Sequence, residues 1–286
     1  MSMENNSISK LFIISLILFL NFGCISTQTE KEILPEYIIL ITLDGTGFDS
    51  LVDANTPIID YLVKEENALF IDINTVCPSN TPNAHASLVT GKLPEDHNYS
   101  YEGDIVEAKT IFEIFEDNNY KTAIIDGKGG RIKGLERGVS YYIGDTDYRG
   151  QEKSNTQVMI KFIELFNEKK PTLSLILLPN IDHLGHKYGP NSKEYFGAIM
   201  ESDEAILKLV NYLNQENLFE KTLIYIYADH GMSVYENNEY NHYKCTPTDM
   251  RIPLIRTSKN FNNNQTNIKS ITDISKEILQ IYNNLN

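Results

Sequence analysis

The stretch D-H-L-G-H-K-Y-G-P at residues 182–190 organises the rest of this chain. It follows an apolar run at residues 173–179, which has the length and the flanks of a buried strand. Asp182 therefore lies just past a strand end, and His186 stands four residues further on. A carboxylate and an imidazole in this arrangement can converge on one borderline metal ion such as zinc. The alternative interpretation is a polar loop that contains two histidines by chance.

Two more strand-like runs end in an aspartate. Residues 37–43 lead into Asp44, and residues 222–228 lead into Asp229 and His230. The carboxyl edge of an open parallel sheet is where ligands and active sites collect, so three aspartates would meet there. Three carboxylates repel one another unless cations neutralise them. A site with two divalent metal ions is the simplest physical resolution.

The composition limits the class of protein. The chain has 286 residues, of which 41% are hydrophobic and 22% charged, and this suits an ordinary globular domain or two small ones. The formal net charge is −14, and no basic stripe is evident. We therefore expect no nucleic-acid polymer as a partner. A small phosphate substrate remains compatible, because bound metal ions can reverse the local sign of the charge.

The N-terminal segment has the pattern of an export signal. Residues 11–22 are almost wholly apolar, which is short for a membrane span but right for a signal sequence. The run ends at Gly23-Cys24, which resembles a lipoprotein processing site; a plain signal anchor or cleavage elsewhere are the alternatives. We expect residues 1–35 to be a signal or lipoprotein-like membrane segment with a linker, and residues 36–286 to be the folded domain. The expected location is extracytoplasmic, either secreted or held at the membrane by this anchor.

Strand-like and helical patterns alternate along residues 36–286, which predicts a wound α/β fold with a mostly parallel sheet and helices on both faces. Further strands are expected at residues 68–74, 122–125 and 252–255. Helices are expected at residues 57–64, 84–89, 110–117, 156–167, 192–215 and 271–285. Two cysteines, Cys77 and Cys245, lie near candidate site residues. They can pair in an exported domain or remain two buried thiols, and the sequence leaves both open.

The segment C-P-S-N-T-P-N-A-H-A-S-L-V-T-G at residues 77–91 adds a candidate nucleophile. With it, the chain resembles the alkaline phosphatase superfamily, specifically its type I phosphodiesterase/nucleotide pyrophosphatase branch. That branch carries a threonine nucleophile eight residues before the valine of V-T-G, matched by Thr81. It also carries D-x-x-G-H-x-x-G-P, an aspartate at the end of the first strand and a later D-H-G. The resemblance spans residues 37–257 and implies an alkaline-phosphatase-like phosphohydrolase domain.

The resemblance also implies a ligand set. One divalent ion would be held by Asp44, Thr81, Asp229 and His230, and the other by Asp182, His186 and His242. Zinc suits such mixed aspartate and histidine ligands best, with manganese as the alternative. His242 is assigned because it precedes the apolar run at residues 252–255, although Tyr243 stands where the family usually has a glycine beside this histidine. His183 falls at a variable position of the motif, so we expect it outside the site.

Thr81 is expected to attack phosphorus and form a phosphothreonine intermediate, because metal coordination lowers the pKa of its hydroxyl. The branch often has an asparagine three residues after the nucleophile, but here that position is Ala84. Contact with a phosphoryl oxygen is therefore assigned to Asn83. Lys128 resembles a lysine of related phosphonate hydrolases and could hold a phosphoryl or carboxylate oxygen. Its other interpretation is a solvated loop lysine.

The sequence thus predicts an exported, two-metal phosphoric ester hydrolase that acts on a small phosphate ester or nucleotide. No arginine occurs in residues 77–91 to meet the extra charge of a monoester, which favours diesters or anhydrides. The alternatives are a phosphomonoesterase or phosphonate hydrolase of the same superfamily, or a non-catalytic metal-binding surface protein. A sulfatase would need a cysteine or serine in place of Thr81, and Cys77-Pro78-Ser79 is out of that register.

Overall fold

The computed structural model describes residues 34–99, 104–144, 154–257 and 267–283. The expected signal segment and the processing site at Cys24 lie outside these ranges. Within them, no helix combines the length and the apolar character needed to cross a membrane.

A seven-stranded sheet runs through the described part of the chain, in the order β2-β9-β6-β1-β5-β3-β4. The strands are β1 (Tyr37–Leu43), β2 (Leu69–Asn74), β3 (Thr122–Asp126), β4 (Tyr141–Ile143), β5 (Leu173–Leu178), β6 (Thr222–Tyr227) and β9 (Arg251–Arg256). β1 is central and pairs in parallel with β5 and β6, whereas β9 is antiparallel to both of its neighbours. The expected mostly parallel sheet is therefore confirmed, with one antiparallel strand inserted near its edge.

The central strands are continuous apolar runs because both of their faces are covered. Every residue of β5 and of β6 is buried, and so are all residues of β1 after Tyr37. A strand with one solvated face would alternate apolar and polar residues, whereas a strand buried on both faces need not. This explains why these three strands could be recognised from the sequence.

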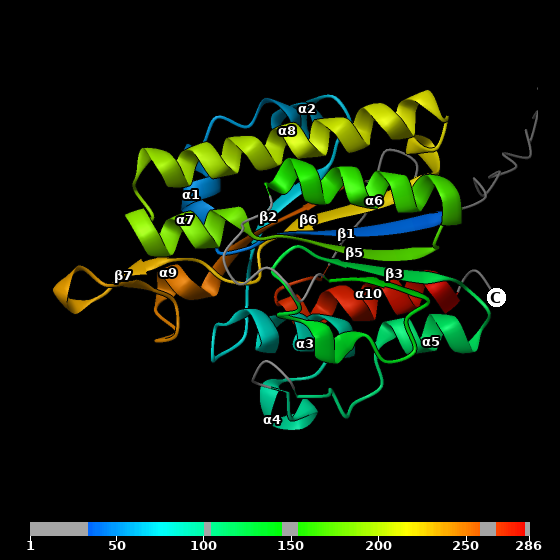
Figure 1. Ribbon diagram of the computed structural model, residues 1–286, viewed down its shortest axis with the longest axis horizontal. Coiled ribbons are helices and arrows are strands. Elements are labelled where there is room, and N and C mark those ends of the chain that lie inside the picture. Colours follow the sequence, from blue (N-terminus) through cyan, green and yellow to red (C-terminus); the bar gives the residue numbers. More distant parts are fainter. Residues whose placement is uncertain (1–33, 100–103, 145–153, 258–266, 284–286) are drawn as a thin grey trace, which may run out of the picture. The chain divides into compact units, whose positions relative to one another are not determined.

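Helices form a layer on each face of the sheet (Figure 1). One layer consists of α1 (Phe48–Asp53), α2 (Pro57–Lys64), α6 (Asn155–Lys169), α7 (Asn180–Tyr188) and α8 (Lys193–Gln215). The other consists of α3 (Thr81–Thr90), α5 (Ile111–Asp117) and α10 (Ile271–Asn283), with the short α4 (Pro94–His97) beyond α3. Each layer encloses its own apolar core, one around Phe162 and Ile206 and the other around Phe112 and Ile274. The helices predicted from the sequence match these elements, most of them within two residues.

The start of α3 differs from the prediction. The helix begins at Thr81, earlier than the expected residue 84, because the side chain of Asn80 caps it by accepting a hydrogen bond from the backbone N–H of Asn83. Pro82 stands in the first turn, where a proline costs no backbone hydrogen bond. The earlier start places the Thr81 hydroxyl in the first turn of a capped helix.

The parallel strands β1, β5 and β6 end at one edge of the sheet. The same edge carries α7, the short helix α9 (Pro247–Met250) and the small hairpin of β7 (Ser233–Val234) and β8 (Tyr240–Asn241) (Figure 1). Segments far apart in the sequence therefore meet at the carboxyl ends of the central strands.

Candidate active site

Three buried aspartates lie at this edge. Asp44 and Asp229 follow β1 and β6, and both are fully buried. Asp182 lies in α7, which begins two residues after β5 ends, so the D-H-L-G-H motif is helical and not an irregular loop. In a helix, residues four apart share one face. His186 Nε2 accordingly lies 3.3 Å from Asp182 Oδ1.

His242 completes the first group of candidate metal ligands. Its Nε2 atom lies 3.2 Å from His186 Nε2 and 3.5 Å from Asp182 Oδ1. One ligand atom each from Asp182, His186 and His242 therefore fall within 4.8 Å of one another. These are the three residues assigned from the sequence to one metal ion.

The second group lies beside the first and shares Asp182 with it. Ligand atoms of Asp44, Asp182 and His230 fall within 4.8 Å of one another. His230 Nε2 lies 3.4 Å from Asp44 Oδ1, 3.5 Å from Asp229 Oδ2 and 3.4 Å from the hydroxyl oxygen of Thr81. All seven residues expected as ligands are thus brought to one place, with Asp182 within reach of both groups.

The proton positions of the three histidines fit metal coordination. Each ring contacts a backbone carbonyl through Nδ1: His186 with Tyr240 O at 2.9 Å, His230 with Gly231 O at 2.9 Å and His242 with Ser79 O at 2.6 Å. A carbonyl oxygen only accepts, so Nδ1 carries the proton and donates it. With Nδ1 bound in this way, Nε2 of each ring faces the carboxylates, which is how proteins usually orient metal-binding histidines.

The aspartate oxygens point to the same conclusion. Among the described residues, Asp44 Oδ1, Asp182 Oδ1 and Asp229 Oδ2 are buried and accept no hydrogen bond. A buried carboxylate oxygen is costly unless a donor or a cation meets it. The residues present therefore fit divalent metal ions, by ligand type and by the unpaired oxygens they hold.

Lys128 enters the same cluster from the loop after β3. Its ammonium lies 2.7 Å from Asp44 Oδ2, 2.7 Å from Asp182 Oδ2 and 3.0 Å from the Thr81 hydroxyl oxygen. The carboxylate of Asp126 holds this loop, because it accepts hydrogen bonds from the backbone N–H of Lys128 and of Ile132. Lys128 is therefore a residue of the site, and its interpretation as a solvated loop lysine is wrong.

Burial and charge set the protonation of this cluster. Burial, followed by repulsion from the Asp229 carboxylate, raises the pKa of Asp44 well above its usual value. Burial would also raise the pKa of Asp182, but the Lys128 ammonium, followed by the neighbouring His186 ring, outweighs it and lowers that pKa well below its usual value. Burial and the nearby His230 lower the pKa of His242 to about 3, so this ring is neutral at physiological pH.

Two other residues singled out in the sequence lie differently. Asn83 is buried in the first turn of α3, and its side-chain amide has no hydrogen-bond partner among the described residues. Its amide is therefore available to a ligand, although no contact ties it to Thr81. His183 belongs to neither group of candidate ligands, as expected.

His85 is a site residue that the sequence analysis missed. It is fully buried one turn after Thr81, and its Nδ1 donates to the Thr81 carbonyl at 2.8 Å. Nδ1 also lies 3.7 Å from Asp229 Oδ2, and Nε2 lies 3.0 Å from the hydroxyl of Thr42 on β1. His85 thus ties the nucleophile's backbone to the sheet. Its position four residues after Thr81 in a helix was the available signal.

Two glycines allow the aspartate loops to come close. Gly45 has φ +77°, and a Cβ there would lie 2.9 Å from the Cα of Asp182. A Cβ on Gly231 would lie 2.0 Å from the backbone oxygen of Thr248. Gly45, directly after Asp44, and Gly231, two residues after Asp229, are therefore required by backbone packing beside the site.

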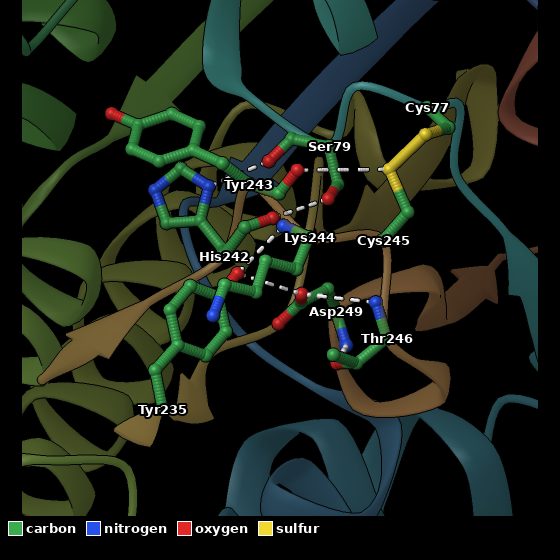
Figure 2. Close-up of a disulfide and its surroundings, with 9 residues drawn as sticks. All are labelled: Cys77, Ser79, Tyr235, His242, Tyr243, Lys244, Cys245, Thr246 and Asp249. Carbon is green, nitrogen blue, oxygen red and sulfur yellow. Dashed lines mark hydrogen bonds between the residues drawn. A yellow bond between two sulfur atoms is a disulfide. The ribbon is translucent and has the colours of Figure 1, made fainter. Parts of the chain in front are cut away.

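The cysteine pairing that the sequence left open is present. Cys77 and Cys245 form a disulfide, which links the segment before α3 to the loop after β8 (Figure 2).

This fold and this cluster at the carboxyl edge define an alkaline-phosphatase-like protein. The family model of type I phosphodiesterase/nucleotide pyrophosphatase matches residues 38–99 and 111–277. The chain therefore belongs to the type I phosphodiesterase/nucleotide pyrophosphatase family. Sequence expectation and comparison agree on this point.

The similar proteins support the same family. A pyrophosphatase/phosphodiesterase of Schizosaccharomyces pombe is 28% identical over 257 residues, covering 81% of this chain and 52% of that protein. Human ectonucleotide pyrophosphatase/phosphodiesterase family member 5 is 25% identical, covering 79% of this chain and 50% of that protein. The solved structure of murine ectonucleotide pyrophosphatase/phosphodiesterase 5 with AMP, an inactive variant, has a TM-score of 0.71 at 16% identity and covers 87% of this chain and 95% of that chain. The present chain thus spans about half the length of these two curated relatives.

Proposed function

We propose that this protein is a metal-dependent hydrolase of phosphoric diesters or nucleotide anhydrides, with Thr81 as its nucleophile. The observation that carries the proposal is the surroundings of the Thr81 hydroxyl oxygen. It lies 3.0 Å from the Lys128 ammonium and 3.4 Å from His230 Nε2, beside the buried carboxylates of Asp44 and Asp182. A threonine packed only for stability would not need a partly buried lysine and unpaired carboxylate oxygens around it.

The proposed metal ligands form two sets. Asp44, Thr81, Asp229 and His230 would hold one divalent ion, and Asp182, His186 and His242 a second, with zinc favoured and manganese as the alternative. Bound ions would supply Lewis-acid charge that lowers the pKa of a hydroxyl and stabilises phosphoryl oxygens.

Thr81 would attack phosphorus from the first turn of α3, expel the alcohol or nucleotide, and leave a phosphothreonine that water then hydrolyses. His85 would keep the backbone of Thr81 in place through its hydrogen bond to the carbonyl. The unpaired amide of Asn83 would donate to a phosphoryl oxygen.

The names of the relatives agree with a nucleotide substrate. The murine structure contains AMP, and a Bos taurus relative, 25% identical over 250 residues, is named bis(5′-adenosyl)-triphosphatase. Other relatives are named ectonucleotide enzymes or venom phosphodiesterases. We therefore propose an extracytoplasmic location for this chain too, with residues 1–35 as its signal or membrane anchor and residues 36–286 as its catalytic domain. Cell fractionation of the full chain beside a variant lacking residues 1–30 would test this location.

One observation favours a second function, hydrolysis of phosphomonoesters. A monoester dianion carries one more negative charge than a diester, and this charge is best met by an added cation at the nucleophile. The Lys128 ammonium stands at that position, 3.0 Å from the Thr81 hydroxyl. The surroundings of Thr81 support phosphoryl transfer to this residue with either substrate. The choice of diesters rests on family membership, whereas the choice of monoesters rests on this lysine.

Replacing the nucleophile tests the proposal. We expect Thr81→Ala to lower kcat by about 1,000-fold or more on a phosphodiester, since the covalent step is lost. Thr90→Ala is the matched control, because Thr90 lies at the other end of α3, where its hydroxyl donates to the Ala86 carbonyl and accepts from the backbone N–H of Lys92. Turnover of Thr81→Ala near that of the wild type, in protein that holds its metal, would exclude Thr81 as the nucleophile. A metal-loaded wild type without turnover on mono- or diesters would favour a non-catalytic binding protein.

A further inference from the structure

A short loop after β8 is fastened to the segment that precedes the nucleophile. Figure 2 shows His242 and Cys245 of this loop beside Ser79 and Cys77. The disulfide joins Cys77 to Cys245, the hydroxyl of Ser79 donates to the His242 carbonyl, and His242 Nδ1 donates to the Ser79 carbonyl at 2.6 Å. Three links therefore connect residues 77–79 to residues 242–245.

These links act on a candidate metal ligand and on the nucleophile's own segment. His242 is the third member of the group with Asp182 and His186, and Ser79 stands two residues before Thr81. The hydrogen bond with Ser79 fixes the proton of His242 on Nδ1, so that Nε2 faces Asp182 without a proton. The orientation of this ring thus depends on where the loop lies relative to Ser79.

Besides these links, the loop is held by a hydrogen bond from the Lys244 backbone N–H to the Tyr235 hydroxyl and by Thr246, which caps α9, but it has little regular structure. The hairpin before it consists of two strands of two residues each, β7 and β8. Cys245 itself has φ +53°, in the left-handed region that a non-glycine residue seldom occupies without a constraint. Cys77 is exposed at the surface, so the disulfide adds little to the apolar core. In the folded protein, the disulfide acts at the loop that carries His242.

We propose that the Cys77–Cys245 disulfide is a positioning device for His242, so that opening it selectively weakens metal binding at Asp182, His186 and His242. This inference rests on the proposed metal-dependent function. With the disulfide open, two of the three links remain, both of them hydrogen bonds between Ser79 and His242, so the tautomer and the direction of the His242 ring are held less firmly. Removing a group that orients a metal ligand typically costs about 10- to 100-fold in metal affinity.

The test uses the full chain and cobalt(II), whose visible absorption reports coordination without any substrate. Tris(2-carboxyethyl)phosphine opens the bond: phosphorus attacks one sulfur, water supplies the oxygen of the phosphine oxide, and two thiols form. We expect the dissociation constant of the Asp182 site to rise by about 10- to 100-fold on reduction, and its spectrum to match that of His242→Ala. Reoxidation should restore both.

Two comparisons separate positioning from general loosening. The ion held by Asp44, Thr81, Asp229 and His230 should keep its affinity. Asp44, Asp229 and His230 follow the central strands, and the backbone of Thr81 is held by the start of α3 and by the hydrogen bond from His85. A variant with Cys77→Ser and Cys245→Ser should show the weakened affinity before reduction and no further change after it, which excludes cobalt binding by the new thiols.

Equal weakening of both ions, or an Asp182-site affinity within about twofold of the oxidised value after reduction, would overturn the positioning role. Oxidised wild-type protein that takes up no cobalt at all would overturn the proposed metal-dependent function together with this inference. If only the positioning inference is wrong, the protein still binds two ions, and neither affinity depends selectively on the disulfide. The two failures are therefore distinguishable.

Discussion

Replacing Lys128 by methionine should change which phosphate ester the protein prefers. The variant keeps the length of the side chain and removes the one ammonium group that lies 3.0 Å from the Thr81 hydroxyl. A hydrogen bond from a charged donor to a phosphoryl oxygen contributes about 1.5 kcal/mol for a monoanionic diester. Because the Coulomb energy scales with charge, the same interaction would contribute about 3 kcal/mol for a dianionic monoester, and the variant would lose it.

These energies translate into different rate losses. At 1.36 kcal/mol for each factor of ten, kcat/KM should fall about 10-fold for an aryl diester and about 100-fold or more for the matched aryl monoester. The ratio of kcat/KM for the diester to kcat/KM for the monoester should therefore rise about 10-fold. Lys133→Met is the control, because Lys133 is exposed and belongs to the same loop region. Equal losses on both substrates would refute the argument that Lys128 senses phosphoryl charge. A wild type that prefers the monoester, and loses that preference in Lys128→Met, would replace the proposed diesterase with a monoesterase.

Two further measurements test other parts of the structure. Asp182→Asn should weaken the binding of both metal ions by more than about 100-fold, because this carboxylate reaches both groups, whereas His183→Ala should leave metal content unchanged in elemental analysis. A Asp182→Asn protein that retains two ions would contradict the assignment. Glu116→Gln should lower the free energy of unfolding by about 1 kcal/mol at pH 7 in urea titrations, since one carboxylate oxygen of Glu116 accepts hydrogen bonds from Thr122 and Ser140. Burial raises the pKa of Glu116, but these hydrogen bonds outweigh it and lower that pKa. The stabilisation is therefore present above the unfolded pKa of about 4.3 and is lost as the pH falls through the lower folded pKa. The difference in free energy of unfolding between variant and wild type should therefore shrink in acid. A free-energy difference that does not depend on pH would count against a charge effect.

The sequence was informative wherever a single segment carried its own signal. The strands β1, β5 and β6 could be predicted because they are buried on both faces and read as continuous apolar runs. The aspartates that follow β1 and β6 were predictable for the same reason. Asp182 and His186 were found through their spacing, although the helix that brings them onto one face was not foreseen.

Contacts between distant segments were less accessible. Whether Cys77 and Cys245 pair depends on how the loop after β8 lies against the segment before α3, and no local pattern encodes that. The position of the Lys128 ammonium depends on Asp126 holding its loop, a contact within a turn that composition does not reveal. The antiparallel direction of β9 follows from the path of the connection before it, whereas its apolar residues would suit either direction.

The central place of β1 in the sheet has a consequence for how the protein is made. Among the strands of the sheet, β1 leaves the ribosome first, but its neighbours β5 and β6 follow only after β2, β3 and β4, so both of its edges stay open until then. Such late pairing makes the nascent chain slow to fold and dependent on protection of its apolar segments. The proposed ligands are spread over the same distance, from Asp44 to His242. A nascent chain would therefore present no complete ligand set until His242 has been synthesised, and complete metal binding would come after that point.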